Sequence, residues 1–171
     1  KWLHMPSQSL ELRFAAEIRA LARMHHPAVV RWLGQGSWDG RPYLVMEYLQ
    51  GDDLRLWTHR SRRLPPIERG RRVRALAARL CQALAHLHGQ ELIHRDVEPS
   101  NVLVLDNDLP VLTDFGVVKD LDDDGKTAMG VVVGTLNYAA PEQLRGGTVD
   151  ARADLYAVGR LLPELTGCAD H

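Results

Sequence analysis

Several features are scarce in this chain of 171 residues, and each scarcity argues against a class of protein. There are only two cysteines, Cys81 and Cys168, so a disulfide framework is not expected. We expect both to be free thiols in a reducing cytosol. An excess of one charge is lacking too: the formal net charge is −1, whereas a nucleic-acid binder usually carries a basic surface. We therefore expect a cytoplasmic protein that binds no nucleic acid.

Long apolar runs are also missing. No stretch approaches the roughly 20 apolar residues that a helix needs to span a bilayer, so no transmembrane segment is expected. The N-terminus shows no charged start followed by an apolar segment, which a signal peptide would have. With 45% hydrophobic and 25% charged residues, the chain has enough apolar material for the core of a soluble globular protein.

The spacing of apolar residues predicts a mixture of helices and short strands. Three stretches at helical spacing predict helices over residues 7–24, 73–87 and 154–165. Four β-type runs predict strands over residues 29–33, 43–48, 102–105 and 111–112. Gly89 is expected to end the second helix, and Pro163 to kink or fray the third. Residues 50–53 look like a polar break before a short helix that begins at Leu54.

Residues 60–74 carry seven arginines. They form either a docking patch for acidic partners or a solvated loop and helix face, and the second interpretation is preferred.

One short loop, residues 94–101, holds both an acid and an amide between a predicted helix and a pair of strands. The acid is Asp96 and the amide is Asn101, five positions later. Asp114-Phe115-Gly116 follows thirteen residues beyond Asn101, and an acid beside glycine suits a metal-binding turn whose backbone approaches a ligand closely. His-Arg-Asp, this asparagine and Asp-Phe-Gly, in that order, form the protein-kinase signature.

Two further motifs follow in the order that protein kinases have. Ala140-Pro141-Glu142, preceded by Tyr138 and by Gly134-Thr135, resembles the segment that receives the substrate in Ser/Thr kinases. Residues 154–159 resemble the C-lobe helix that carries a buried aspartate. The chain thus resembles the eukaryotic-type protein kinases over essentially its whole length, and within them the Ser/Thr branch with its bacterial members.

This resemblance implies an α+β fold with two lobes, incomplete at both ends. Residues 1–49 would form part of a β-rich N-lobe with one helix, and residues 50–171 part of a mostly helical C-lobe. It also implies ATP as phosphate donor, Mg²⁺ as cofactor and a protein Ser or Thr hydroxyl as acceptor. Asp96 would orient that hydroxyl and accept its proton, while Asn101 and Asp114 would hold the magnesium ions.

The resemblance also implies a nucleotide site made of Lys1, Glu17, Met46, Glu47, Leu49 and Leu103, together with Asp114. Lys1 would pair with Glu17, Met46 would occupy the gatekeeper position, and residues 47–49 would form the hinge that hydrogen-bonds adenine. From the residues alone, Glu17 is a solvated helix glutamate. Leu103, at the adenine floor, is interpreted as a core residue.

Regulation is implied at three positions. Arg95, beside Asp96, would bind a phosphate on the activation segment in bidentate fashion. Thr127 would be the phosphoacceptor, Thr135 lies near the substrate-binding segment, and the acidic run 122–124 either substitutes for the phosphate or forms a solvated loop. A stack of side chains between the lobes is implied at Leu21, Trp32, His94 and Phe115, with Asp154 as its anchor.

Glu98 departs from the family pattern, because it stands where the family has a lysine that touches the transferring phosphate. At an effective dielectric of about 20 and about 4 Å, a unit-charge pair is worth roughly 4 kcal/mol, so a reversed sign would slow transfer by several powers of ten. Two hypotheses follow: an active Ser/Thr kinase domain, or a pseudokinase or inactive fragment that binds nucleotide or acts as a scaffold.

Overall fold

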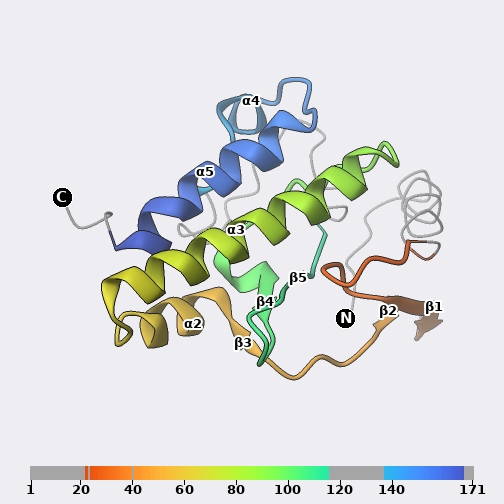
Figure 1. The fold of residues 1–171 in the computed structure, drawn as a ribbon. Coiled ribbons are helices and arrows are strands. Elements are labelled where there is room, and N and C mark those ends of the chain that lie inside the picture. Colours follow the sequence, from red (N-terminus) through yellow and green to blue (C-terminus); the bar gives the residue numbers. More distant parts are fainter. Residues whose placement is uncertain (1–21, 23, 40, 116–136, 168–171) are drawn as a thin grey trace.

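The computed structural model describes residues 22, 24–39, 41–115 and 137–167, and Figure 1 shows their arrangement. The elements in chain order are β1 (Trp32–Trp38), β2 (Arg41–Met46), β3 (Asp52–Asp53), α2 (Leu54–Ser61), α3 (Pro66–His88), the 3-10 turn η1 (Pro99–Asn101), β4 (Val102–Val104), β5 (Pro110–Leu112), α4 (Pro141–Leu144) and α5 (Arg152–Thr166). No helix in this part of the chain combines the length and apolar character needed to cross a membrane. The predicted helix over 7–24 lies almost entirely outside the described residues.

The long helix α3 is the centre of the molecule, and α5 packs along it (Figure 1). The buried residues of α3 recur at helical spacing and are Val73, Leu76, Leu80, Ala83, Leu84 and Leu87. Leu161 and Leu165 of α5 belong to the same core. Because full burial of one large aliphatic side chain contributes about 1.5–3 kcal/mol, this core is a major source of stability.

Helix α3 starts at Pro66, earlier than the apolar spacing predicted. The arginine-rich stretch 60–74 therefore divides between the last turn of α2, a short connection and the first turns of α3. Proline suits the first helical position, where its missing N–H would have no partner within the helix. The predicted end is confirmed, since Gly89 is the C-cap and its N–H donates to the carbonyl of Ala85 over 3.0 Å.

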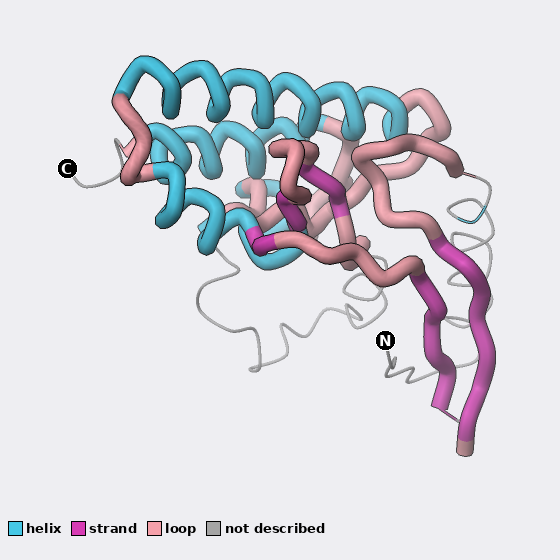
Figure 2. The backbone as a smooth tube through the Cα atoms, turned by 60° about the horizontal axis from the view of Figure 1, so that its bottom comes forward, coloured by secondary structure: helices cyan, strands magenta, loops and turns pink. Residues whose placement is uncertain are grey.

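The strands form two separate antiparallel sheets. The pair β1–β2 is a hairpin whose turn includes Asp39 with φ of +51°, and the second sheet has the order β3-β4-β5. In Figure 2 the hairpin extends away from the helices, whereas the small sheet lies against them. The second sheet therefore connects directly to the helical core.

The first two strands are displaced from their predicted ranges of 29–33 and 43–48. The apolar residues just before β1 do not pair with β2; Val30 donates its N–H to the carbonyl of Leu112 over 2.9 Å, and Val29 forms an isolated bridge with the same residue. The hairpin instead extends through Gly34 and Gly36, residues with weak strand preference that pairing with β2 holds extended.

Strand β3 was not predicted, because residues 50–53 were interpreted as a polar break. Asp52 pairs with Val104 and Asp53 with Leu103. The Oδ1 atom of Asp53 also accepts the N–H of Leu56 over 2.7 Å, which caps helix α2. Because the strand consists of two acidic residues, it has no apolar periodicity from which it could be predicted.

Helix α5 does not fray at Pro163 but continues to Thr166. Proline removes one backbone hydrogen bond and presses on the carbonyl four residues earlier, which here belongs to Gly159. The hydroxyl of Thr166 donates to the carbonyl of Leu162 over 2.9 Å, and Gly167, at φ of +76°, closes the helix. The last turn is therefore stabilised by its own capping.

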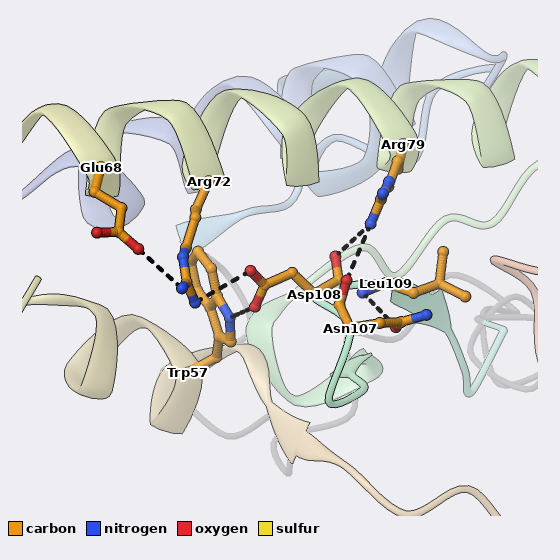
Figure 3. A network of polar contacts seen from close by, with 7 residues as sticks. All are labelled: Trp57, Glu68, Arg72, Arg79, Asn107, Asp108 and Leu109. Atoms are coloured by element: carbon orange, nitrogen blue, oxygen red, sulfur yellow. Dashed lines mark hydrogen bonds and ion pairs between the residues drawn. The ribbon is translucent and has the colours of Figure 1, made fainter.

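Asp108 holds the turn between β4 and β5 against two helices (Figure 3). Its Oδ1 accepts the indole N–H of Trp57 on α2 over 2.9 Å, and its Oδ2 lies 3.3 Å from the guanidinium of Arg72 on α3. Arg79 donates to the carbonyl of Asp108 over 3.1 Å. Asp108 has a φ of +56°, a left-handed conformation that aspartate and asparagine tolerate better than most residues.

We expect Asp108→Ala to lower the free energy of unfolding by about 1–3 kcal/mol, because Trp57 and Arg72 lose their partner and alanine is disfavoured at positive φ. Asp108→Asn should lower the free energy of unfolding by a smaller amount, since asparagine keeps a hydrogen-bond acceptor and tolerates this backbone conformation. Urea unfolding followed by tryptophan fluorescence measures both. The matched control is Asp106→Ala on the same turn, an exposed side chain without a hydrogen bond in the described part of the chain. If Asp106→Ala and Asp108→Ala lowered the free energy of unfolding equally, the role of Asp108 would be contradicted.

Candidate active site

The loop 94–101 is held by the carboxylate of Asp154 on α5, which is only 1% exposed. Asp154 accepts the backbone N–H groups of His94 and Arg95 over 2.9 and 2.8 Å, and the Nε2 atom of His88 lies 2.8 Å from its Oδ2. Arg95 has a φ of +64°, a conformation rare for this residue type, and the hydrogen bond to Asp154 holds it there. The predicted anchor role of Asp154 is consistent with these contacts.

Sequence reasoning missed His88. The residue stands in the last turn of α3, and its partner Asp154 lies 66 positions later. No local pattern signals such a contact, since it depends on the packing of α3 against α5.

The ring of His94 is fully buried beneath the loop. Its Nε2 lies 3.0 Å from the carbonyl oxygen of Thr113, and its centroid is 4.5 Å from that of Phe115. Phe115 in turn lies 6.1 Å from the ring of Trp32. Three of the four residues expected to stack between the lobes therefore meet, while Leu21 lies outside the described residues.

Asp96 and Asn101 are joined directly. The Nδ2 atom of Asn101 donates to both the carbonyl and the Oδ2 of Asp96, over 2.9 and 2.8 Å. The amide oxygen Oδ1 of Asn101 takes no part in these two hydrogen bonds and is chemically an acceptor. The N–H of Thr113 donates to the carbonyl of Asn101 over 2.9 Å, which brings the neighbouring Asp114, at φ of +50°, to the same end of the loop.

The donor atoms at this place suit magnesium. Mg²⁺ prefers oxygen ligands and is usually bound by one or two carboxylates together with substrate phosphates. Across the described residues, no three His, Cys, Asp or Glu side chains lie close enough to hold a metal by themselves. Asp114 and Asn101 are the residues that would hold such an ion, which would offset the charge of bound phosphates.

Glu98 is a buried residue of the loop 94–101, with 9% of its surface exposed. Its Oε1 accepts the hydroxyl of Ser100 over 2.5 Å, but its Oε2 is buried with no hydrogen-bond partner in the described part of the chain. Most buried polar atoms are hydrogen-bonded, because an unpaired one costs roughly 1–3 kcal/mol. Glu98 thus leaves one buried carboxyl oxygen without a hydrogen-bond partner in the described part of the chain, two residues from Asp96.

Tyr138 lies close enough to Glu98 for that carboxylate to affect the pKa of the phenol. Burial raises the pKa of Tyr138 well above its usual range, and the hydrogen bond from its hydroxyl to the Oε1 of Glu164, 2.6 Å long, raises it further. The charge of Glu98 adds a smaller contribution in the same direction, whereas Arg55 acts in the opposite direction. The phenol therefore stays protonated and donates to Glu164.

The predicted hinge leaves two backbone groups available. Glu47 donates its N–H to the carbonyl of Arg31 over 2.9 Å, and its Oε1 accepts the N–H of Arg31 over 2.7 Å. In the described part of the chain, no backbone hydrogen bond uses the carbonyl of Glu47 or the N–H of Leu49. Met46 and Leu49 pack against the core from the side.

Leu103 was interpreted as a core residue from the sequence, and this is wrong. It is half-buried on β4 between the fully buried Val102 and Val104, and it does not belong to the core cluster. Because side chains alternate along a strand, Leu103 points to the opposite face of the sheet. The remaining predicted site residues, Lys1, Glu17, Thr127 and Thr135, lie outside the described residues.

Comparison with known proteins agrees with this geometry. The family model described as "Protein kinase domain" matches residues 4–169. The chain therefore belongs to the protein kinase domain family. It is 40% identical over 166 residues to the serine/threonine-protein kinase PknB of Mycolicibacterium smegmatis, covering 93% of this chain and 26% of that protein.

Two further likenesses are consistent with this. The DNA damage-responsive serine/threonine-protein kinase RqkA of Deinococcus radiodurans is 43% identical over 158 residues, which are 88% of this chain and 22% of that protein. The crystal structure of the PknI kinase domain of Mycobacterium tuberculosis matches with a TM-score of 0.67 and 30% identity, over 94% of this chain and 57% of that one. The two-lobe kinase fold predicted from the sequence, in incomplete form, is thus confirmed. The chain spans about a quarter of the length of these curated relatives.

We expect the stability of the protein to fall at acid pH because of His94. Burial lowers the pKa of His94 below its usual value of 6.5, although Asp154 and Asp96 act in the opposite direction. The unfolded chain then takes up a proton first as the pH falls, so the contribution of His94 is present above about pH 6.5 and is lost below it. Burial, together with the charge of His86, also lowers the pKa of His26 and adds to the effect.

Urea unfolding at about pH 7.5 and about pH 5 measures this dependence. His94→Gln should reduce the difference between the two free energies, whereas His59→Gln, at an exposed position, should keep it. A wild-type protein equally stable at both pH values would show that His94 is not held neutral.

Proposed function

We propose that this chain transfers the γ-phosphate of ATP to Ser or Thr hydroxyls of proteins. The observation that carries the proposal is the contact between Asp96 and Asn101 on a loop held by Asp154. Because Asn101 fixes one oxygen of the carboxylate, Asp96 presents its side chain in a defined direction. An acceptor hydroxyl bound to it would be oriented and would lose its proton to Asp96.

The nucleotide would bind between the hinge and the sheet β3-β4-β5. The carbonyl of Glu47 and the N–H of Leu49 are suited to hydrogen-bond the adenine edge, with Met46 beside the base and Leu103 beneath it. Lys1, paired with Glu17, would hold the phosphates from the N-lobe, residues 1–49, opposite the C-lobe, residues 50–171. Asn101 and Asp114 would hold magnesium, which offsets the phosphate charge when bound.

The choice of Ser and Thr as acceptors is supported by the relatives, which are named serine/threonine-protein kinases. We also propose that Arg95 binds a phosphate on Thr127 or Thr135 and so makes the activity dependent on phosphorylation. We also propose a cytoplasmic signalling role without nucleic acid as a partner; the near-neutral net charge is consistent with the lack of a nucleic-acid surface.

Glu98 should limit the rate of this transfer. Its charge adds to that of the phosphates in the transition state, and a unit pair at about 4 Å and a dielectric of about 20 is worth roughly 4 kcal/mol. We expect Glu98→Lys to raise the rate at least about tenfold and Glu98→Gln to give an intermediate rate. Transfer of labelled γ-phosphate from Mg²⁺–ATP to a Ser-containing protein measures the rates.

The control is the double variant Asp96→Asn with Glu98→Lys, which should lose about 10²- to 10⁴-fold in rate because the base is gone. A rate that does not change in Glu98→Lys would contradict the role of Glu98. If Mg²⁺–ATP raises the melting temperature of the wild type and of Glu98→Lys but neither transfers phosphate, the nucleotide-binding scaffold replaces the kinase as the function.

A further inference from the structure

The side chain of Gln143, in the short helix α4, makes hydrogen bonds in two directions. Its Nε2 atom donates to the backbone carbonyl of Arg95 over 2.8 Å, and its Oε1 atom accepts the N–H of Ala140 over 2.9 Å. Arg95 lies 48 positions earlier in the sequence, directly before Asp96. One side chain therefore joins the start of α4 to the loop 94–101.

Glutamine is the residue type that these two contacts require. The carbonyl of Arg95 needs a hydrogen-bond donor, and the N–H of Ala140 needs an acceptor. A carboxylate lacks the donor, whereas lysine and arginine lack the acceptor. Ala140 is fully buried, so an unpaired N–H at that position would be costly. The two partners also fix the orientation of the amide, because a flipped amide would set oxygen against oxygen and N–H against N–H.

The backbone of Arg95 is held from two sides. Its N–H donates to the carboxylate of Asp154 on α5 over 2.8 Å, and its carbonyl accepts the hydrogen bond from Gln143 on α4. This carbonyl belongs to the same rigid peptide plane as the N–H of Asp96, so the bond from Gln143 fixes the plane from which Asp96 projects. The amide of Asn101 holds the carboxylate of Asp96 itself. The base is therefore oriented through both its backbone and its side chain.

The segment that leads into α4 is fixed to α5 as well. Residues 138–142 include the motif that is expected to receive the substrate, and the hydroxyl of Tyr138 donates to the Oε1 of Glu164 over 2.6 Å. Helix α5 also carries Asp154, so this segment and the loop 94–101 share one support. Gln143 adds a direct link between the two.

We propose that Gln143 is a positioning residue for phosphate transfer. Through the carbonyl of Arg95, it holds Asp96 in register with the segment that receives the acceptor hydroxyl. A base acts only within hydrogen-bond reach of the proton that it accepts, so a small rotation of Asp96 slows the transfer. The inference rests on the proposed kinase function, because the register of base and acceptor affects a rate only if phosphate is transferred.

Two variants separate the link to Arg95 from the capping of α4. Gln143→Glu keeps the acceptor for the N–H of Ala140 but sets a carboxylate oxygen against the carbonyl of Arg95, whereas Gln143→Met loses both hydrogen bonds at similar side-chain length. We expect both variants to lower kcat for a Ser-containing protein about ten- to a hundredfold. The KM for Mg²⁺–ATP should stay within about twofold, since the hydrogen bonds of Gln143 involve none of the residues proposed to bind the nucleotide.

The matched control is Gln82→Glu, which adds the same charge at an exposed position of α3 and should keep kcat. Hydrogen exchange followed by NMR gives a readout that needs no phosphate transfer. The amide of Asp96, whose nitrogen lies 3.4 Å from the Nδ1 of His94, should exchange about three- to tenfold faster in both variants of Gln143. The amide of Ala140 should exchange faster in Gln143→Met alone. Melting temperatures close to that of the wild type would show that the variants are folded.

A kcat of Gln143→Glu equal to that of the wild type would overturn the proposal, because the capping of α4 alone would then account for Gln143. An equal fall of kcat in Gln82→Glu would overturn it too. If the wild type transfers no phosphate, the kinase function fails, and the exchange of the Asp96 amide decides whether Gln143 holds the loop. Faster exchange in Gln143→Glu would then support the link, and unchanged exchange would refute it.

Discussion

The buried carboxylate of Asp154 is the interaction on which the rest of the site depends. A charge that is 1% exposed is costly unless it is fully hydrogen-bonded, and Asp154 receives the N–H groups of His94 and Arg95 together with His88. These three partners come from the catalytic loop and from α3, while Asp154 itself belongs to α5. The packing of the two long helices therefore sets where the loop lies.

Two residues of the site have left-handed backbones, Arg95 at φ of +64° and Asp114 at φ of +50°. Such conformations cost of order 1–3 kcal/mol each and persist only where surrounding contacts impose them. Asp154 does so for Arg95, and the hydrogen bonds of Thr113 to Asn101 hold the chain next to Asp114. Glu98 lies within this framework, where Ser100 is its hydrogen-bond partner.

The order of motifs from His94 to Asp154 was enough to predict the kinase family and fold, because the chemistry requires those residue types at those separations. The periodicity of α3 predicted its buried face and its end at Gly89 equally well. The strand β3 and the role of His88 were missed, since both depend on pairing between distant segments. Leu103 was misassigned because strand periodicity over three residues cannot say which face meets the core. The arginine-rich stretch 60–74 was interpreted as a solvated loop and helix face, but its division between α2, a short connection and α3 depends on where the helices begin and end, which the charge pattern does not show.

Amide hydrogen exchange of His94 and Arg95 tests the role of Asp154 most directly, in the wild type and in Asp154→Asn. Asparagine keeps the shape but loses the charge and one acceptor oxygen. We expect both amides to exchange slowly in the wild type and at least about tenfold faster in the variant, a change of about 1.4 kcal/mol. The amides of Leu80 and Leu84 in the middle of α3 should stay protected. Unchanged exchange at His94 and Arg95 would contradict the claim that Asp154 holds the catalytic loop.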